Sequence, residues 1–189
     1  MDAETFVSLA LRNPANDAIL SALDGLRLPD AWLVSGCLVQ SVWNALTDRP
    51  IAYGINDYDV FYFDLDTSWD AEDRAIRQFD PIARELNVTI QVRNQARVHL
   101  WYEQKFGTPY PQLRCSTEGI DRFLTRNTKI GLRRDGGRHE VYSPDGFDDV
   151  AGLVITPNRS ANFSRERYLE KATRWQSLWP ELRLIEALP

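Results

Sequence analysis

Two aspartates, Asp57 and Asp59, are separated by one residue at the start of a stretch rich in aromatic and β-branched residues. Alternate side chains of a β-strand point the same way, so both carboxylates would lie on one face. Carboxylates held so close repel each other, and a hard divalent cation such as Mg²⁺ or Mn²⁺ relieves that repulsion. The pair therefore indicates a metal site suited to phosphoryl or nucleotidyl transfer, although most such pairs merely begin a strand in solvent.

A second motif, Ser35-Gly36, follows the apolar run at 31–34 and precedes a helical pattern. A small residue and a glycine that open a helix present backbone N–H groups and the positive end of the helix dipole, which suits a phosphate chain. Taken alone, the pair is also typical of an ordinary tight turn. The combination of strand, Ser-Gly, helix, loop and Asp-x-Asp strand is more informative than either motif by itself.

The elements that must position these motifs follow from the spacing of apolar residues. Two short helices are expected before the first strand, because apolar residues recur at helical intervals between 6 and 10 and again between 19 and 23. After them, the pattern predicts a strand at 31–34, a helix at 36–46, a strand at 58–63, a helix at 69–86 and a strand at 88–92.

The second half of the chain is expected to hold two helices, a hairpin and a closing helix. The helices cover 97–106, ending at Gly107, and 118–124; hairpin strands at 130–133 and 140–142 flank Asp135-Gly136-Gly137; and Ser164 caps a helix that ends at Pro180. Repeats and linker-like tracts do not interrupt the sequence. We therefore expect one domain over 1–189, with a core at roughly 30–142 and a C-terminal extension at roughly 143–189.

The composition indicates a folded protein that acts inside the cell. With 43% hydrophobic residues over 189 positions, the chain can bury a substantial core. A formal charge of -5 disfavours non-specific attraction to nucleic acid and membranes, so nucleic acid is a partner that the charge does not indicate. Two cysteines without CxxC spacing, an acidic amino terminus and the lack of a long apolar run predict a cytoplasmic location without a membrane partner.

The two motifs, taken together, resemble those of a known protein family. Ser35-Gly36, the helix after it and Asp57-x-Asp59 resemble the signature of the DNA polymerase β-type nucleotidyltransferase superfamily. Longer stretches at 36–44, 54–59 and 94–102, together with Pro157-Asn158 and 171–180, are similar to a small bacterial family of that superfamily. The resemblance covers roughly residues 30–182 and implies an α/β (α+β) fold with a small mixed sheet, flanking helices and a C-terminal helical portion.

The same resemblance implies an activity. An acceptor hydroxyl, of a class that the sequence does not specify, would attack the α-phosphate of a nucleoside triphosphate, and pyrophosphate would leave. Asp57 and Asp59 would hold the metal, while the Ser35 hydroxyl and the Gly36 amide would hold the outer phosphates.

Two features near the third predicted strand bear on this expectation. Gln91 stands where the superfamily commonly has a third carboxylate, and an amide can ligate a metal through its carbonyl oxygen but cannot act as a base. Asn94 and Arg97 are further nucleotide-binding candidates, although Asn94 could equally cap the next helix. Trp101 and Tyr102 could stack on a base, but core packing explains them as well.

Two alternatives remain open at this point. The run at 60–68 resembles the first motif of haloacid dehalogenase-type phosphatases, in which Asp64 would be the nucleophile and Asp66 the acid and base. That reading departs from the motif after the second aspartate and leaves Asp57 and Asp59 without a role. Alternatively, Gln91 breaks the carboxylate triad, and the chain serves as a catalytically impaired nucleotide-binding or interaction module.

Overall fold

A five-stranded mixed sheet forms the centre of the computed structural model, which describes residues 1–186. The strands lie in the order β3-β2-β1-β4-β5; their bounds are β1 (Trp32–Val34), β2 (Tyr58–Tyr62), β3 (Ile90–Asn94), β4 (Gly131–Asp135) and β5 (Arg138–Tyr142). β2 and β3 are parallel, whereas β1 pairs antiparallel with β2 and β4, and β4 with β5. The sheet and the helices beside it confirm the expected fold class.

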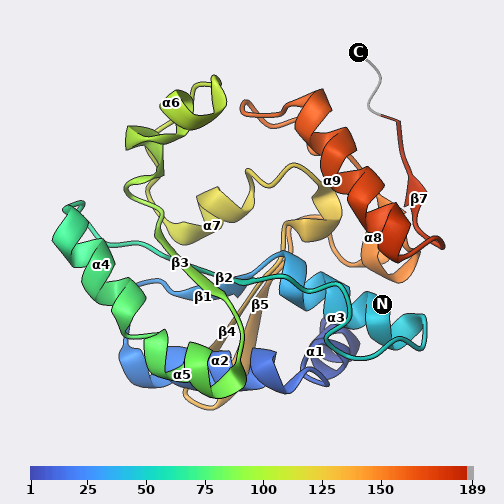
Figure 1. Cartoon of the computed structure of the whole chain (residues 1–189), viewed down its shortest axis with the longest axis horizontal. Coiled ribbons are helices and arrows are strands. Elements are labelled where there is room, and N and C mark those ends of the chain that lie inside the picture. Colours follow the sequence, from blue (N-terminus) through green and yellow to red (C-terminus); the bar gives the residue numbers. More distant parts are fainter. Residues whose placement is uncertain (187–189) are drawn as a thin grey trace.

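The amino-terminal helices cover one side of the sheet, which Figure 1 shows edge-on. They are α1 (Ala3–Ala10), α2 (Pro14–Leu26) and α3 (Gly36–Leu46). Asn13 caps α2, since its side-chain oxygen accepts a hydrogen bond from the backbone N–H of Ala15. The amide nitrogen of Asn13 donates to the hydroxyls of Ser41 and Tyr58, so this cap also ties α2 to α3 and to β2.

The helix predicted at 69–86 is divided in the structure. α4 (Trp69–Arg77) and α5 (Asp80–Leu86) are separate, because Pro81 lacks an N–H and its ring clashes with the carbonyl four residues earlier. Asn87 ends α5 in the left-handed conformation, with a φ of 53°, and β3 begins at Ile90, two residues later than predicted. The strand predicted at 88–92 is therefore present, but both of its bounds lie two residues later than predicted.

Short elements replace the helices predicted in the middle of the chain. The segment expected at 97–106 forms a 3₁₀ turn, η1 (Val98–Leu100), and then α6 (Tyr102–Phe106), which ends at Gly107 as predicted. The helix expected at 118–124 is α7 (Ser116–Ile120), and η2 (Arg126–Thr128) follows it. Three further elements were not predicted: α8 (Asp148–Ala151) and the parallel pair β6 (Val154–Ile155) and β7 (Arg183–Leu184).

The closing helix, α9 (Arg165–Leu178), is fixed against α3 by tryptophans. The rings of Trp175 and Trp179 meet Trp43 edge-on at centroid distances of 5.3 Å and 5.6 Å. The indole N–H of Trp179 donates to the side-chain oxygen of Asn44 at 2.9 Å, so the polar group of this buried ring has a hydrogen-bond partner. Because β1 leads directly into α3, this contact sets where α9 lies relative to the sheet.

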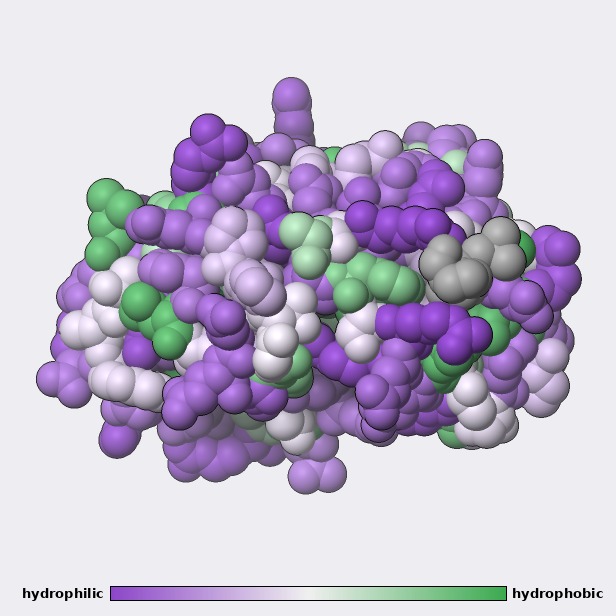
Figure 2. Space-filling model, turned by 90° about the horizontal axis from the view of Figure 1, so that it is seen from above, coloured by the Kyte–Doolittle hydropathy of each residue, from purple (hydrophilic) through white to green (hydrophobic). Residues whose placement is uncertain are grey.

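The surface is mixed in character. Figure 2, a view from above, shows a mostly hydrophilic face on which hydrophobic residues are scattered. Within residues 1–186, no helix has both the length and the apolar character needed to cross a bilayer.

Candidate functional site

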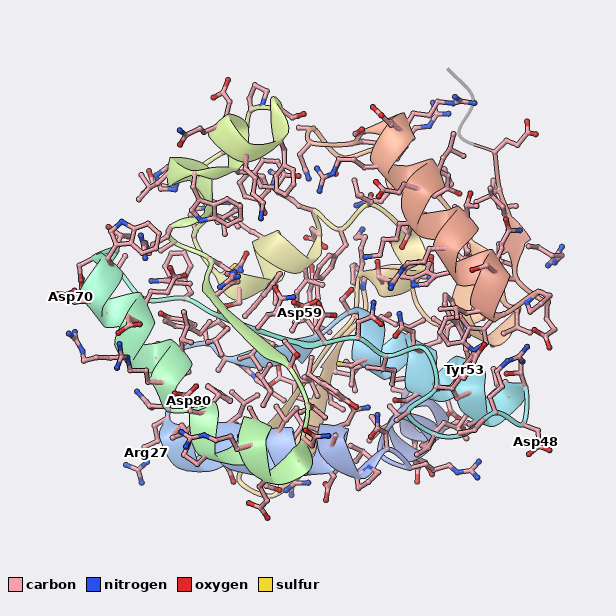
Figure 3. The ribbon with its side chains drawn as sticks, in the orientation of Figure 1. Arg27, Asp48, Tyr53, Asp59, Asp70 and Asp80 are labelled. Atoms are coloured by element: carbon pink, nitrogen blue, oxygen red, sulfur yellow. The ribbon has the colours of Figure 1, made fainter. Side chains whose placement is uncertain are left out.

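The two aspartates lie on the face of the sheet opposite the main core. Along β2, Tyr58, Val60 and Tyr62 are buried in that core, and the alternation of a strand places Asp59 and Phe61 on the other face. Asp57 lies directly before β2, two positions before Asp59, so its side chain is expected on the same face of the sheet. In Figure 3, Asp59 lies in the middle of the molecule, whereas the other labelled acidic residues lie near its margin.

Gln91 is brought beside this pair by the pairing of β2 with β3. Its position opposes Asp59 in the parallel register, so both side chains leave the same face of the sheet. The side-chain amide nitrogen of Gln91 donates to Asp57 Oδ2 at 2.5 Å. The structure thus places two carboxylates and one amide together, at the positions from which metal ligands were expected.

The turn into α3 lies next to the same pair, because Val34 opposes Asp59 in the β1–β2 register. Ser35 has φ 62° and ψ -123°, a conformation that costs a residue with a side chain about 1–3 kcal/mol. Its backbone N–H donates to the carbonyl of Ile130 at 2.8 Å, and its hydroxyl does not cap the helix. The backbone strain is at Ser35, since a Cβ at Gly36 would meet Gln40 at an ordinary 3.6 Å.

The amino-terminal turn of α3 is electrostatically coupled to the aspartates. Burial raises the pKa of the Cys37 thiol well above its ordinary value, and the charge of Asp59 raises it further. A helix leaves the N–H groups of its first turn without internal partners. These groups and the positive end of the helix dipole therefore lie close to Asp59, although neither Ser35 nor Gly36 lines the cavity described next.

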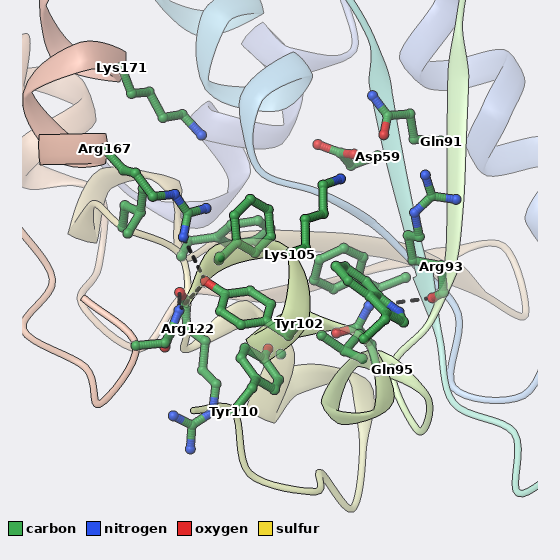
Figure 4. Close-up of a pocket in the computed structure, with 18 residues that line it drawn as sticks. Asp59, Gln91, Arg93, Gln95, Tyr102, Lys105, Tyr110, Arg122, Arg167 and Lys171 are labelled. Atoms are coloured by element: carbon green, nitrogen blue, oxygen red, sulfur yellow. Dashed lines mark hydrogen bonds between the residues drawn. The ribbon is translucent and has the colours of Figure 1, made fainter. Parts of the chain in front are cut away.

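A cavity of about 310 Å³ opens beside Asp59, between the sheet, α6, α7 and α9. Its walls carry five basic side chains, namely Arg93, Lys105, Arg122, Arg167 and Lys171. None of these five forms an ion pair with a carboxylate within residues 1–186. Figure 4 shows Lys105 and Lys171 pointing toward the space in which Asp59 lies. With one carboxylate, that of Asp59, against five basic side chains on its walls, the cavity has an excess of positive charge that is suited to a polyanion.

Burial and charge shift the pKa values of Asp59 and Lys171 in this cavity. Burial, and then repulsion from Asp57, raises the pKa of Asp59 to about 6, with Lys171 and Arg93 acting in the opposite direction. Burial lowers the pKa of Lys171, while the charge of Asp59 opposes this shift. A divalent cation or a basic group next to Asp59 would stabilise its ionised form and lower its pKa.

The raised pKa of Asp59 predicts that, without divalent cations, the contribution of this residue to the free energy of unfolding falls as pH rises from 3.8 to about 6. In this window the folded state holds a proton that the unfolded chain has already released, so rising pH favours unfolding. Asp59→Asn lacks this titration, and its gain in stability over wild type should be largest above the window. Urea unfolding of both proteins in a chelator, on either side of the window, measures this difference. An equal gain at both pH values would contradict the prediction.

The metal-ligand set is limited to the residues already described. Within residues 1–186, no group of three or more His, Cys, Asp or Glu side chains is placed to hold a metal ion. Two carboxylates and the carbonyl oxygen of Gln91 are hard oxygen donors, and Mg²⁺ commonly binds through one or two carboxylates plus waters and substrate phosphates. The donor set therefore fits such a cation bound together with a polyphosphate.

Asn94 and Arg97, the further nucleotide-binding candidates, are used elsewhere and do not line the cavity. The Asn94 side chain bonds the backbone of Asp64, Asp66 and Ala96, which closes the turn after β3. Arg97 is buried, and one of its guanidinium nitrogens lies 2.5 Å from a carboxylate oxygen of Glu72. Both residues therefore hold the end of β3 in place. They act on the site indirectly, because β3 carries Gln91.

The two aspartates of the phosphatase-like motif lie in a turn outside the cavity. Asp64 and Asp66 accept hydrogen bonds from the backbone N–H groups of Asp66 and Ser68, respectively, in the turn that leads to α4. Neither aspartate lines the cavity beside Asp59. Both aspartates stabilise the turn through their side chains, a common role of aspartate, and Ser68 caps α4.

The cations of the cavity were missed by the sequence analysis. Lys105, Arg122, Arg167 and Lys171 come from segments that are distant in sequence, and isolated basic residues carry no spacing signal. One partial signal was present on α9, where Arg167 and Lys171 are four residues apart and share a helix face. That face borders the buried one formed by Tyr168, Ala172 and Trp175, so it had to lie at the edge of the core.

Comparisons with known proteins agree with this geometry. A family model described as "Nucleotidyltransferase" matches residues 21–184. No curated protein matches the chain. An NMR structure described as revealing a CCA-adding enzyme head domain has a TM-score of 0.78 at 22% sequence identity, with 98% of this chain and 97% of that chain covered. At this identity, the similarity establishes the fold.

Proposed function

Because the chain belongs to the nucleotidyltransferase family, we propose that it transfers a nucleoside monophosphate from a nucleoside triphosphate to a hydroxyl acceptor, with Mg²⁺ or Mn²⁺ as the cofactor. One observation carries this proposal: Asp59, with Asp57 two positions before it, lies beside a cavity whose described walls carry five basic side chains and one carboxylate. The carboxylates account for a cation, and the basic residues account for a polyphosphate.

In this mechanism, Asp57 and Asp59 would hold the cation, which would supply positive charge to neutralise the phosphates. Lys171 and Arg167 lie on one side of the cavity, on α9, and bind the non-bridging phosphate oxygens. The backbone N–H groups in the first turn of α3 carry partial positive charge and add to the attraction for phosphate. Charge developing on the leaving pyrophosphate is therefore met by groups that are already in position.

The acceptor hydroxyl must lose its proton during the transfer. Among the described residues, Asp59 is the only carboxylate that lines the cavity, and the cavity contains no histidine. Gln91 cannot take up a proton at its amide. We therefore assign proton removal to Asp59 in its ionised form.

The test is transfer of label from nucleoside triphosphates that are radioactive at the α-phosphate. Each of the four ribonucleotides is incubated with the protein and Mg²⁺ or Mn²⁺, in the presence of protein, RNA or small-molecule hydroxyl acceptors. Transfer of label together with pyrophosphate release supports the proposal. Binding and turnover that are both absent with every nucleotide would overturn it.

A second candidate, a nucleotide-binding module without turnover, is favoured by the hydrogen bond from Gln91 to Asp57. This bond places an amide N–H, which cannot ligate a metal, against one of the two carboxylates. Such a module would bind the metal–nucleotide complex in a calorimeter but release no pyrophosphate. Pyrophosphate release therefore separates the two candidates.

Lys171→Met is expected to weaken the binding of nucleoside triphosphate by about tenfold or more. Methionine keeps the apolar stem but removes the charge, and a hydrogen bond to a charged group contributes roughly 1.5–3 kcal/mol. Calorimetry with Mg²⁺ and each nucleotide measures the change. Arg77→Gln, which removes an exposed charge on α4, is the control and should bind as wild type. Equal affinity of Lys171→Met and wild type would remove Lys171 from its assigned role.

A further inference from the structure

The walls of the cavity carry aromatic side chains as well as basic ones. Those on its walls are Phe61, Trp101, Tyr102, Phe106, Tyr110 and Phe123. In Figure 4, Tyr102 and Tyr110 lie on the side of the cavity opposite Gln91. Lys105, Arg122 and Arg167 each lie over one or more of these rings. The cavity therefore combines basic side chains with an aromatic region, made of these six rings, that the phosphate chemistry does not require.

The aromatic residues differ in what they leave available to a ligand. Tyr102 is buried, and its hydroxyl accepts hydrogen bonds from Asn162 and from Arg167, at 3.1 Å and 2.9 Å. This phenol joins α6 to α9 across the cavity and serves as a structural strut. Trp101, in contrast, is only partly buried, and its ring is 6.0 Å from the ring of Tyr102. The ammonium of Lys105 lies 5.6 Å from the centroid of the Trp101 ring. Because Trp101 lines the cavity and is not fully buried, part of its side chain is still accessible to a ligand, while Tyr102 holds the wall in place.

A buried amide, that of Gln95, also faces this region. Gln95 is 2% exposed, lines the cavity, and its amide nitrogen lies 3.4 Å from the carbonyl of Arg93, at the long limit of a hydrogen bond. The side chain fits only because residue 119 is glycine: a Cβ there would come within 2.2 Å of the Gln95 side-chain oxygen. An amide offers one donor and one acceptor side by side, which matches the edge of a nucleobase.

We propose that the aromatic region binds the base of the nucleoside triphosphate, with Trp101 stacking on its face and Gln95 hydrogen bonding its edge. This inference rests on the proposed function, which supplies the triphosphate. Two independent features support it: a partly open aromatic ring and a buried amide without a strong partner for its N–H, on the walls of one cavity. Small-molecule sites commonly combine aromatic walls with a few well-placed polar groups, as here.

The first test compares nucleoside triphosphates with inorganic tripolyphosphate, which has no base. Calorimetry with Mg²⁺ should show that Trp101→Ala weakens binding of the preferred nucleotide by about five- to a hundredfold, the usual effect of losing a stacking partner. Binding of tripolyphosphate should not change, and Trp101→Phe should restore most of the nucleotide affinity. Trp69→Ala is the matched control, because Trp69 is 75% exposed and does not line the cavity.

The outcomes separate the base site from the proposed function. If wild type binds nucleotide no tighter than tripolyphosphate, or if Trp101→Ala binds nucleotide as wild type does, the base site is overturned while phosphate binding still stands. If wild type binds neither ligand, the proposed function fails and the base site fails with it.

The second test addresses recognition of the base edge. Gln95→Met keeps the length of the side chain and removes its amide, so the affinities for the four nucleoside triphosphates should converge while tripolyphosphate affinity is retained. A reduction of the preference by about tenfold corresponds to the loss of one good pair of hydrogen bonds. An unchanged order and spread of the four affinities would overturn the role of Gln95.

Discussion

Asp59→Asn should lower the rate of nucleotidyl transfer by roughly a hundred- to a thousandfold. Asparagine fills the same volume, but it cannot take the acceptor's proton and binds a divalent cation far less well than a carboxylate. Charge stabilisation by a metal is worth several kcal/mol in the transition state, and each 1.36 kcal/mol is a factor of ten in rate. Transfer of α-phosphate label, with wild type and variant compared under the same conditions, measures the effect.

Asp64→Asn is the matched control, because the same change is made five positions away, in a turn outside the cavity. This variant should transfer label at close to the wild-type rate. Full activity of Asp59→Asn would refute the mechanism. Loss of all activity in Asp64→Asn alone would instead favour the phosphatase hypothesis. A folded Asp59→Asn protein, verified by its unfolding transition, shows that any loss is chemical.

The sequence was sufficient for the fold class and for the family, and both predictions are confirmed. Both predictions rest on local features. The alternation of buried and less buried side chains along the strand that contains Asp59 follows from strand geometry, and the small residues at 35–36 mark the start of a helix. Such features extend over a few neighbouring residues, so their spacing in the chain preserves their arrangement in space. The closing helix and the hairpin at Gly136-Gly137 were predicted for the same reason.

The errors arose where tertiary contacts decide the outcome. The break between α4 and α5 could have been predicted from Pro81, but the late start of β3 depends on its pairing with β2, which brings Gln91 opposite Asp59. The 3₁₀ turn at 98–100 replaced a helix because Asn94 and Arg97 bond to groups on the preceding elements. Local propensity is a weak prior, and contacts of this kind override it.

The positions of the candidate site residues could be predicted only in part. Asp57, Asp59 and Gln91 come from paired strands, so a correct sheet places them together. Lys171 reaches the same cavity through a different route, namely the tryptophan contacts that seat α9 on α3. A contact between helices more than a hundred residues apart has no signature in the spacing of either helix.

The buried ion pair between Glu72 and Arg97 is the contact whose loss should cost the most stability among the polar contacts discussed. Glu72 on α4 accepts hydrogen bonds from the backbone N–H of Asn94 and from the guanidinium of Arg97. The side chains of Glu72 and Arg97 are 7% and 4% exposed, and the guanidinium lies 4.3 Å from the ring centroid of Trp69. The pair therefore fixes α4 to the end of β3, and it does so away from bulk water.

Glu72→Gln should lower the free energy of unfolding by about 3–5 kcal/mol, since it leaves the charge of Arg97 buried without a partner. Asp73→Asn, one position along α4, removes an exposed ion pair with Arg77 and should change stability by less than about 1 kcal/mol. Chemical denaturation of both variants measures these effects. The double variant Glu72→Gln with Arg97→Met should recover part of the loss, because the unpaired charge is then absent. Equal stability of Glu72→Gln and Asp73→Asn would show instead that water or another group compensates Arg97, and that the end of β3 is held by its strand pairing alone.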